Sequence, residues 1–235
     1  MPAVLDDQTI YQDIRTGRYD FADFGSCEGG SIDYCSRRFD AARGLGIDIL
    51  QCEVDKMRAR GFDALCADIT TFDCPTASFR FVSMMDFLEH LPDYEVVAKI
   101  LTTARRIARD FLFIRHPSFE DEHYLNAVGL KQFWTDWPGP GGHTAKLTIA
   151  DFTQIFSKLG FNQYAIAYRC PAHDSNDDCI LPLGAPPNEH HYDAARHGPK
   201  PVVAFPRPVY GQIDIFVALR PMPNPEWART ILQFD

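Results

Sequence analysis

The stretch Asp23-Phe24-Gly25-Ser26-Cys27-Glu28-Gly29-Gly30-Ser31 decides the fold. The apolar residues 19–24 lead into it, and an amphipathic segment that begins near Gly30 follows it, so the stretch joins a predicted strand to a predicted helix. Its glycines allow a sharp turn and a close approach of the backbone to a ligand. Such a turn is a weak signal alone, and its meaning depends on the segments around it.

Strands and helices are expected to alternate on both sides of this turn, which predicts an α/β fold with a mostly parallel sheet. The first helix should place Ile32, Cys35, Phe39 and Ala42 on one face and stop at Gly44. Later helices are expected through Met57, over residues 96–107, and from a cap at Thr148 or Asp151 to Gly160. The remaining strands are expected over residues 45–49, 63–67, 79–84, 111–114, 163–168 and 213–219.

Acidic residues follow the predicted strands after the turn. Asp48 ends the second strand, Asp68 follows the third, and Asp86 follows the fourth. Parallel strands bring their carboxyl ends to one edge of a sheet, and an acid about 20 to 25 residues after the turn can accept both ribose hydroxyls of a nucleoside. The pattern predicts a nucleoside-binding crevice at this edge.

With these motifs the chain resembles the class I S-adenosylmethionine-dependent methyltransferases, over roughly residues 19–170 plus the last strand. The resemblance implies a Rossmann-like three-layer sandwich whose seven-stranded sheet is mostly parallel, with the last strand antiparallel. It also implies S-adenosyl-L-methionine as the cofactor, held across the ends of the first four strands. The residues that match the family's cofactor motifs are Asp23, Gly25, Ser26, Cys27, Glu28, Gly29, Asp48, Ile49, Asp68, Ile69, Met85, Asp86 and Phe87. Cys27 departs from the family pattern, which has a glycine there.

Three alternatives stay open at this point. A nicotinamide oxidoreductase also uses a glycine-rich turn, but Glu28 inside the turn would repel a pyrophosphate, whereas acids complement the ammonium and sulfonium of S-adenosylmethionine. A non-catalytic cofactor-binding scaffold would keep Asp48 and Asp68 but lack an acceptor pocket. Some of the acids could also merely cap turns or helices.

Methyl transfer needs an acceptor placed in line with the methyl group, and a hydroxyl acceptor usually also needs a base. His143 and His116 are the candidate catalytic residues, because they follow the glycine-rich residues 138–142 and the fifth strand. In the family, a histidine at the position of His90 often has no chemical role. We expect a small-molecule acceptor, with an oxygen on a carbohydrate-like metabolite as the leading hypothesis. Trp134, Trp137 and Tyr124 could stack on it or simply cover the sheet edge.

Two segments interrupt the alternation of strands and helices. Residues 117–147 are expected on the substrate side, and the Pro- and His-rich residues 170–210 are expected as an insertion between the last two strands, forming a lid over the acceptor. His190, His191, Asp193 and His197 match no standard ligand spacing, so no metal site is predicted.

Composition limits the remaining choices. The 235 residues, 46% of them hydrophobic, suit a single domain over residues 1–235. A net charge of −9 with no basic cluster disfavours a nucleic-acid partner. We see no signal peptide or membrane-spanning run, and the seven cysteines form no CxxC pair, so we expect reduced thiols in a cytoplasmic protein without membrane contact. The oligomeric state is left open.

Overall fold

The structure is a computed structural model and describes residues 5–139, 141–187 and 189–221. Its main sheet consists of β1 (Phe21–Phe24), β2 (Gly44–Asp48), β3 (Asp63–Cys66), β4 (Phe79–Met85), β5 (Ala108–Pro117), β7 (Tyr164–Asp174) and β9 (Ala204–Ala218). The helices that pack on it are α1 (Asp7–Arg15), α2 (Gly30–Arg38), α3 (Gln51–Ala59), α4 (Tyr94–Ile107) and α6 (Ile149–Leu159). All seven strands expected from the sequence are present.

The sheet has the strand order β3-β2-β1-β4-β5-β9-β7. Neighbouring strands from β3 to β5 pair in parallel, while β9 runs antiparallel to both of its neighbours, β5 and β7. This confirms the predicted seven-stranded, mostly parallel sheet with an antiparallel last strand. The order reverses beside β1, so the carboxyl ends of β1 and β4 flank the point where such folds bind ligands.

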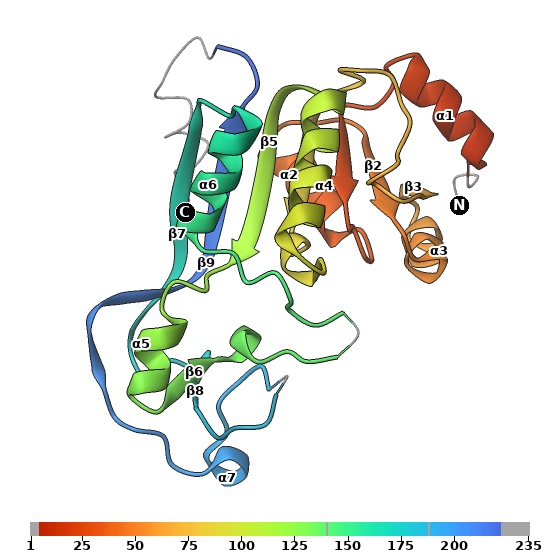
Figure 1. The fold of residues 1–235 in the computed structure, drawn as a ribbon. Helices are drawn as coiled ribbons and strands as arrows, with labels where there is room; N and C mark the ends of the chain where they lie inside the picture. The colour runs from red at the N-terminus through yellow and green to blue at the C-terminus, as the bar shows by residue number, and fades with distance from the viewer. Residues whose placement is uncertain (1–4, 140, 188, 222–235) are drawn as a thin grey trace.

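Apolar side chains from alternate strand positions cover both faces of the sheet, as a sheet buried between helices requires. One face packs against α1, α4 and α6, where Ile10, Leu101 and Phe156 are buried. The other packs against α2 and α3 through Ile32 and Met57. The molecule is therefore the three-layer sandwich expected, with helices on either side of the strands (Figure 1).

A smaller lobe lies beneath the carboxyl edge of the sheet (Figure 1). It contains α5 (Glu122–Ala127), β6 (Leu130–Gln132), β8 (Ile180–Pro182) and α7 (Ala194–His197), together with the 3-10 turn η2 (Phe133–Thr135). β6 and β8 pair antiparallel, so the two segments that interrupt the alternation in sequence lie together in space. Their small core includes Leu125, Leu130 and Ile180.

The segment 170–210 is more ordered than its sequence suggests. β7 continues to Asp174 and β9 begins at Ala204, and these ends pair with each other beyond the main sheet. The expected strand end near Tyr168 was therefore too early. Most side chains in these extensions are partly or fully exposed, so the apolar alternation that identifies a half-buried strand is absent.

Two helix assignments also differ from expectation. α2 ends at Arg38 instead of near Ala42, because Asp40 takes a left-handed backbone conformation with φ 47°. α1 had not been expected, although Asp6 caps it by accepting a hydrogen bond from the Thr9 N–H at 2.7 Å. Neither difference moves the ends of the strands.

Candidate cofactor and acceptor sites

The glycine-rich turn leaves β1 and enters α2, and its backbone needs glycine at two points. Gly25 and Gly29 have φ values of 67° and 84°, in the left-handed region that glycine favours. A side chain at Gly25 would collide with the ring of Phe87, and a Cβ at Gly29 would lie 2.6 Å from the ring of Phe62. Cys27 also has a positive φ, 47°, so the chain keeps the turn's shape at the one position that departs from the family pattern.

Asp23 lies under this turn rather than on its surface. Its carboxylate is fully buried and accepts hydrogen bonds from the hydroxyls of Ser31 and Ser83, the latter at 2.6 Å. Ser26 donates to the Asp23 carbonyl at 2.6 Å. Burial raises the pKa of Asp23 to about 6, although the serine donors oppose that rise. Asp23 thus ties the turn to α2 and β4.

Asp48 ends β2, and Asp68 lies two residues after the neighbouring strand β3, at the same edge of the sheet. Asp48 is paired with Cys66 in the parallel register, and its carbonyl accepts from the Ala67 N–H at 2.9 Å. Each carboxylate uses Oδ1 to accept a hydrogen bond two residues ahead, Asp48 from Leu50 and Asp68 from Thr70. Both acids therefore order their own turns, as the capping interpretation supposed, and both follow strand ends on the same edge of the sheet.

Three further predicted cofactor residues differ in exposure. The side chain of Ile49, directly after β2, is 65% exposed, which is unusual for a large apolar residue at a strand end. Ile69 is buried. Glu28 lies in solvent, with its carboxylate 3.9 Å from the Arg60 guanidinium. The exposed Ile49 beside Asp48 is an apolar surface of the kind that an adenine ring would cover.

The end of β4 joins the cofactor edge to the rest of the site. Met85 approaches Cys35 of α2, and Phe87 packs over the turn at Gly25. Between them, Asp86 has φ 49°, a strained conformation for a residue with a side chain. Asp86 is accessible to solvent but sits in a concave wall of protein atoms, whose desolvating effect raises its pKa to about 6.

A cavity of about 490 Å³ begins at Asp86 and extends under the sheet into the smaller lobe. Its walls come from residues 86–90 after β4, from β5, β7 and β9, and from the two interrupting segments. The lining residues are Asp86, Glu89, His90, Pro117, Phe133, Trp134, Trp137, His143, Cys170, Cys179, Gly211 and Gln212. Most of the surface is apolar, with acids and imidazoles at one end, which is typical of a small-molecule site.

The two predicted catalytic histidines have different surroundings. His143 lines the cavity, stacks on Trp137 with ring centroids 5.4 Å apart, and donates from Nδ1 to the Trp134 carbonyl at 2.7 Å. His116 is fully buried against Phe119 and Phe152 and is not among the lining residues. Burial lowers the pKa of each imidazole to about 4. Of the two, only His143 faces the space in which an acceptor could bind.

Comparison with known proteins identifies the family. The sequence family described as "Methyltransferase domain" matches residues 22–110, which run from β1 to the start of β5 and include both the turn and the strand-end acids. Residues 22–110 therefore carry a methyltransferase domain, and the chain is similar to the class I S-adenosylmethionine-dependent methyltransferases. It is accordingly an enzyme, and its cofactor is S-adenosyl-L-methionine. None of the curated proteins matches the chain.

Solved structures share the methyltransferase's fold at low sequence identity. A SAM-dependent methyltransferase from Archaeoglobus fulgidus has a TM-score of 0.58 and 15% identity, over 91% of this chain and 94% of that one. The YcgJ protein of Bacillus subtilis has a TM-score of 0.55 and 14% identity, over 92% and 100%. Magnesium protoporphyrin IX methyltransferase from Synechocystis, solved with bound SAH, has a TM-score of 0.51 and 13% identity, over 90% and 80%.

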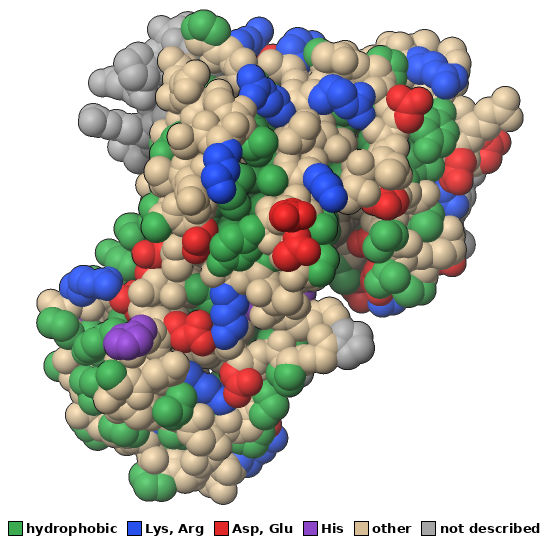
Figure 2. Space-filling model, viewed as in Figure 1, with side chains coloured by type: hydrophobic (Ala, Val, Ile, Leu, Met, Phe, Trp, Pro, Cys, Tyr) green, Lys and Arg blue, Asp and Glu red, His purple; other side chains and the backbone are tan. Residues whose placement is uncertain are grey.

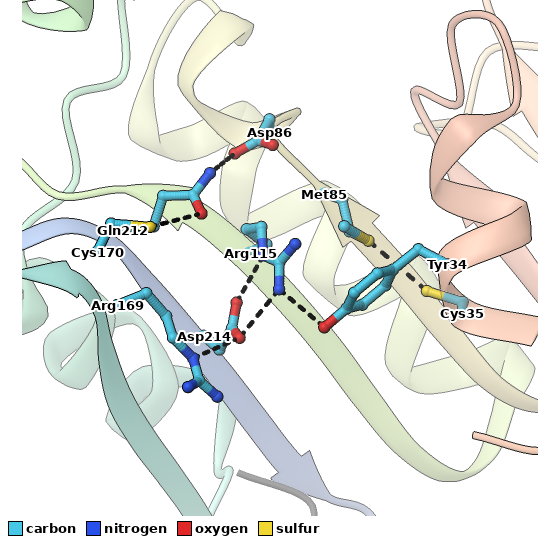
Figure 3. Close-up of polar contacts among 9 residues, drawn as sticks. All are labelled: Tyr34, Cys35, Met85, Asp86, Arg115, Arg169, Cys170, Gln212 and Asp214. Carbon is cyan, nitrogen blue, oxygen red and sulfur yellow. Dashed lines mark hydrogen bonds and ion pairs between the residues drawn. The ribbon is translucent and has the colours of Figure 1, made fainter. Parts of the chain in front are cut away.

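A buried ion-pair network beside the methyltransferase's cavity was not found from the sequence. Asp214 of β9 is 0% exposed and accepts from Arg115 of β5 at 2.8 Å and from Arg169 of β7 at 3.0 Å (Figure 3). Arg115 also donates to the Tyr34 hydroxyl at 2.9 Å, and Gln212, two residues before Asp214, donates to Asp86 at 3.4 Å. The network thus joins β5, β7 and β9, which all contribute to the cavity wall.

Other cavity residues were missed or given little weight. Phe133, Cys170, Cys179 and Gln212 lie in segments without periodicity, so no sequence signal placed them together. His90 lines the cavity, although the resemblance gave it no chemical role. Trp134 and Trp137 also line it, whereas Tyr124 packs on Phe205 in the core of the smaller lobe.

On the face shown in Figure 2, separate Lys and Arg side chains lie mainly over the upper part of the molecule, and acidic side chains lie mainly nearer its middle and right. In the part of the chain that the structure describes, no helix combines the length and apolar character needed to cross a membrane. The described residues include all seven cysteines, and none of these is paired in a disulfide.

Proposed function

We propose that this methyltransferase acts on a hydroxyl oxygen of a small, carbohydrate-like metabolite bound in the cavity of the smaller lobe. The observation that carries the proposal is the position of Asp86, which directly follows β4 at the cofactor edge and also lines the cavity. A methyl donor at that edge and an acceptor in the cavity would therefore meet at Asp86. The presence of an acceptor-sized cavity also argues against a non-catalytic scaffold.

The residues at the cofactor edge fit S-adenosylmethionine. Gly25 lets the turn approach Phe87, Ile49 offers an uncovered apolar side chain for the adenine, and Asp48 offers a carboxylate for the ribose. We propose that the thirteen residues named from the sequence surround the cofactor, with Asp23 acting from beneath the turn. When bound, S-adenosylmethionine supplies an electrophilic methyl group, and its transfer to a hydroxyl yields a methyl ether, S-adenosylhomocysteine and one proton.

The chain's own contribution is to position the acceptor and to receive its proton. Phe133, Trp134 and Trp137 provide aromatic faces that can stack on a sugar ring. Because the Trp134 carbonyl can only accept, His143 must donate from Nδ1, which leaves the Nε2 lone pair free. We assign proton removal to His143, with His116 supporting the wall behind it. A cytoplasmic location, supported by the seven unpaired thiols, and the absence of a nucleic-acid partner belong to this proposal.

The experiment begins with the cofactor edge. The substitution Asp48→Ala should weaken S-adenosylmethionine binding at least tenfold, about 1.4 kcal/mol, because its carboxylate is expected to accept the ribose hydroxyls. Calorimetric titration of the purified chain measures this, with Asp73→Ala as a control acid that is exposed in the loop after β3. An unchanged dissociation constant, or saturable binding of NAD, would contradict the assignment of this edge.

The acceptor is then identified by incubating the wild-type chain with methyl-labelled cofactor and a panel of hydroxyl, amine and thiol metabolites. We expect label in methyl ethers of small polyhydroxylated compounds. Transfer only to nitrogen or sulfur would refute the oxygen acceptor while leaving the cofactor assignment intact.

A further inference from the structure

Three metal-binding side chains converge at the polar end of the acceptor cavity. One oxygen of Glu89 and one nitrogen each of His90 and His143 all lie within 4.8 Å of one another. Glu89 and His90 belong to the 3-10 turn η1 (Leu88–His90) after β4, and His143 lies more than fifty residues later. All three residues line the cavity.

Backbone hydrogen bonds hold these two segments together. The carbonyl of Glu89 accepts from the N–H groups of Thr144 and Ala145, at 2.8 and 3.0 Å. The ring of His90 contacts the Gly141 carbonyl at 2.6 Å through Nδ1. These bonds bring the ring centroids of His90 and His143 to 4.8 Å from each other. The juxtaposition therefore rests on main-chain bonds from both segments and not on side-chain rotation alone.

Both imidazoles are oriented like those of metal ligands. Each places Nδ1 against a carbonyl, Gly141 for His90 and Trp134 for His143, so Nδ1 must carry the proton. Each Nε2 atom is then unprotonated and offers its lone pair to a metal ion. A hydrogen bond from Nδ1 to a carbonyl is the usual support of a histidine that binds a metal through Nε2. Nε2 of His90 lies 4.0 Å from Glu89 Oε1.

Glu89 is the unusual member of the group. Its side chain is 1% exposed, and Oε2 has no hydrogen-bond partner among the described residues. A buried carboxyl without a partner is costly, and such a group calls for an explanation. Burial raises the pKa of Glu89 well above its usual value, and the nearby negative charge of Asp86 raises it further. A cation at this point would neutralise both acids.

The three donor atoms would have to move closer together to bind a transition-metal ion. Donors bound tetrahedrally at about 2.1 Å stand about 3.4 Å apart, so atoms that lie within 4.8 Å of one another would need to close by up to about 1.4 Å. Two imidazoles and one carboxylate favour Zn²⁺, Fe²⁺, Co²⁺ or Mn²⁺ over Mg²⁺ and Ca²⁺, which prefer oxygen ligands.

The geometry points to a divalent transition-metal site formed by Glu89, His90 and His143 in the acceptor cavity. Its role rests on the proposed function: the ion would coordinate the acceptor hydroxyl and lower its pKa, and the proton would leave to water. His143 would then serve as a ligand in place of a base. This departs from the expectation, drawn from the sequence, that the chain holds no metal, because that expectation considered the histidines of residues 170–210.

Binding of Co²⁺ to the chelator-treated chain tests the site directly. We expect one equivalent to bind, with the visible absorption of nitrogen and oxygen ligation. Glu89→Gln and His90→Ala should each weaken binding at least tenfold, and Mg²⁺ should compete poorly. His173→Ala, which alters an exposed histidine of β7, is the matched control and should leave binding unchanged.

Three results would overturn the site. These are no binding of Co²⁺ by the wild type, a Co²⁺ affinity in both ligand variants equal to that of the wild type, or the intense charge-transfer absorption of thiolate ligation. The last would indicate Cys170 and Cys179 instead, and Cys170→Ser would remove it. Titration with S-adenosylhomocysteine on the same samples checks folding. It also separates the two proposals, since retained cofactor binding without metal binding refutes the metal site alone.

Discussion

The cofactor edge and the acceptor cavity meet at Asp86 but are built in different ways. At the edge, Asp48 and Asp68 each accept a hydrogen bond from a backbone N–H two residues ahead. The cavity instead combines η1, the end of β5, residues 133–143 and both long strands of the smaller lobe. The cofactor end is thus a local structure repeated along a sheet, whereas the acceptor end depends on long-range pairing.

The largest effect should come from the junction between these regions. Arg115→Ala leaves buried Asp214 with only part of its compensating charge, so we expect a loss of about 3 kcal/mol in the free energy of unfolding. Urea denaturation measures it. Arg109→Ala is the control, because the Arg109 side chain is 55% exposed in its ion pair with Asp110, and it should cost less than about 1 kcal/mol. Equal losses in the two variants would show that the buried Arg115–Asp214 pair stabilises the fold no more than an exposed ion pair does.

The second effect concerns pH and the wall behind the cavity. Burial lowers the pKa of His116 from 6.5 to about 4, so between these values the unfolded chain binds a proton that the folded chain excludes. This residue therefore destabilises the fold as the pH falls from 6.5 to 4, by up to about 3 kcal/mol, and contributes no such loss above 6.5.

Comparing the wild type with His116→Asn isolates this contribution, because Asp23 and Asp86, whose pKa values are raised, change with pH in both proteins. The stability of the variant should fall less steeply over the window in urea titrations at successive pH values. His123→Asn, at an exposed position, should follow the wild type. Parallel curves for wild type and His116→Asn would mean that the buried imidazole takes up its proton without unfolding.

The smallest effect separates the two regions most cleanly. Trp137→Ala removes an aromatic face of the cavity and the ring stacked on His143, so the KM for the acceptor should rise about tenfold. The dissociation constant for S-adenosylhomocysteine should change less than about twofold, since Trp137 belongs to the cavity wall and not to the glycine-rich turn or the ends of β2 and β3. Steady-state kinetics and calorimetry give the two numbers. A matching loss of cofactor affinity would show that the two sites are not independent.

Much of the fold was predictable because its signals are local. Ile32 and Cys35 recur at helical spacing, and strand residues are continuously apolar where both faces are covered. Thr148, one of the two caps expected before α6, is the N-cap and forms a capping box with Asp151. The β7 and β9 extensions were missed because most of their side chains are partly or fully exposed, and the few buried ones, such as Ala172 and Val209, pack into the smaller lobe without a regular alternation. α1 was missed although its N-cap and its buried Ile10 and Ile14 were readable.

The candidate site divides in the same way. Strand-end positions of Asp48, Asp68 and Asp86 follow from the sequence, because parallel strands necessarily share a carboxyl edge. Only the tertiary structure decided that Glu89 is buried without a partner, that His90 and His143 adjoin, and that His116 turns away from the cavity. These outcomes depend on hydrogen bonds and strand pairings between residues tens of positions apart, and periodicity within one segment carries no information about which distant segment it will meet.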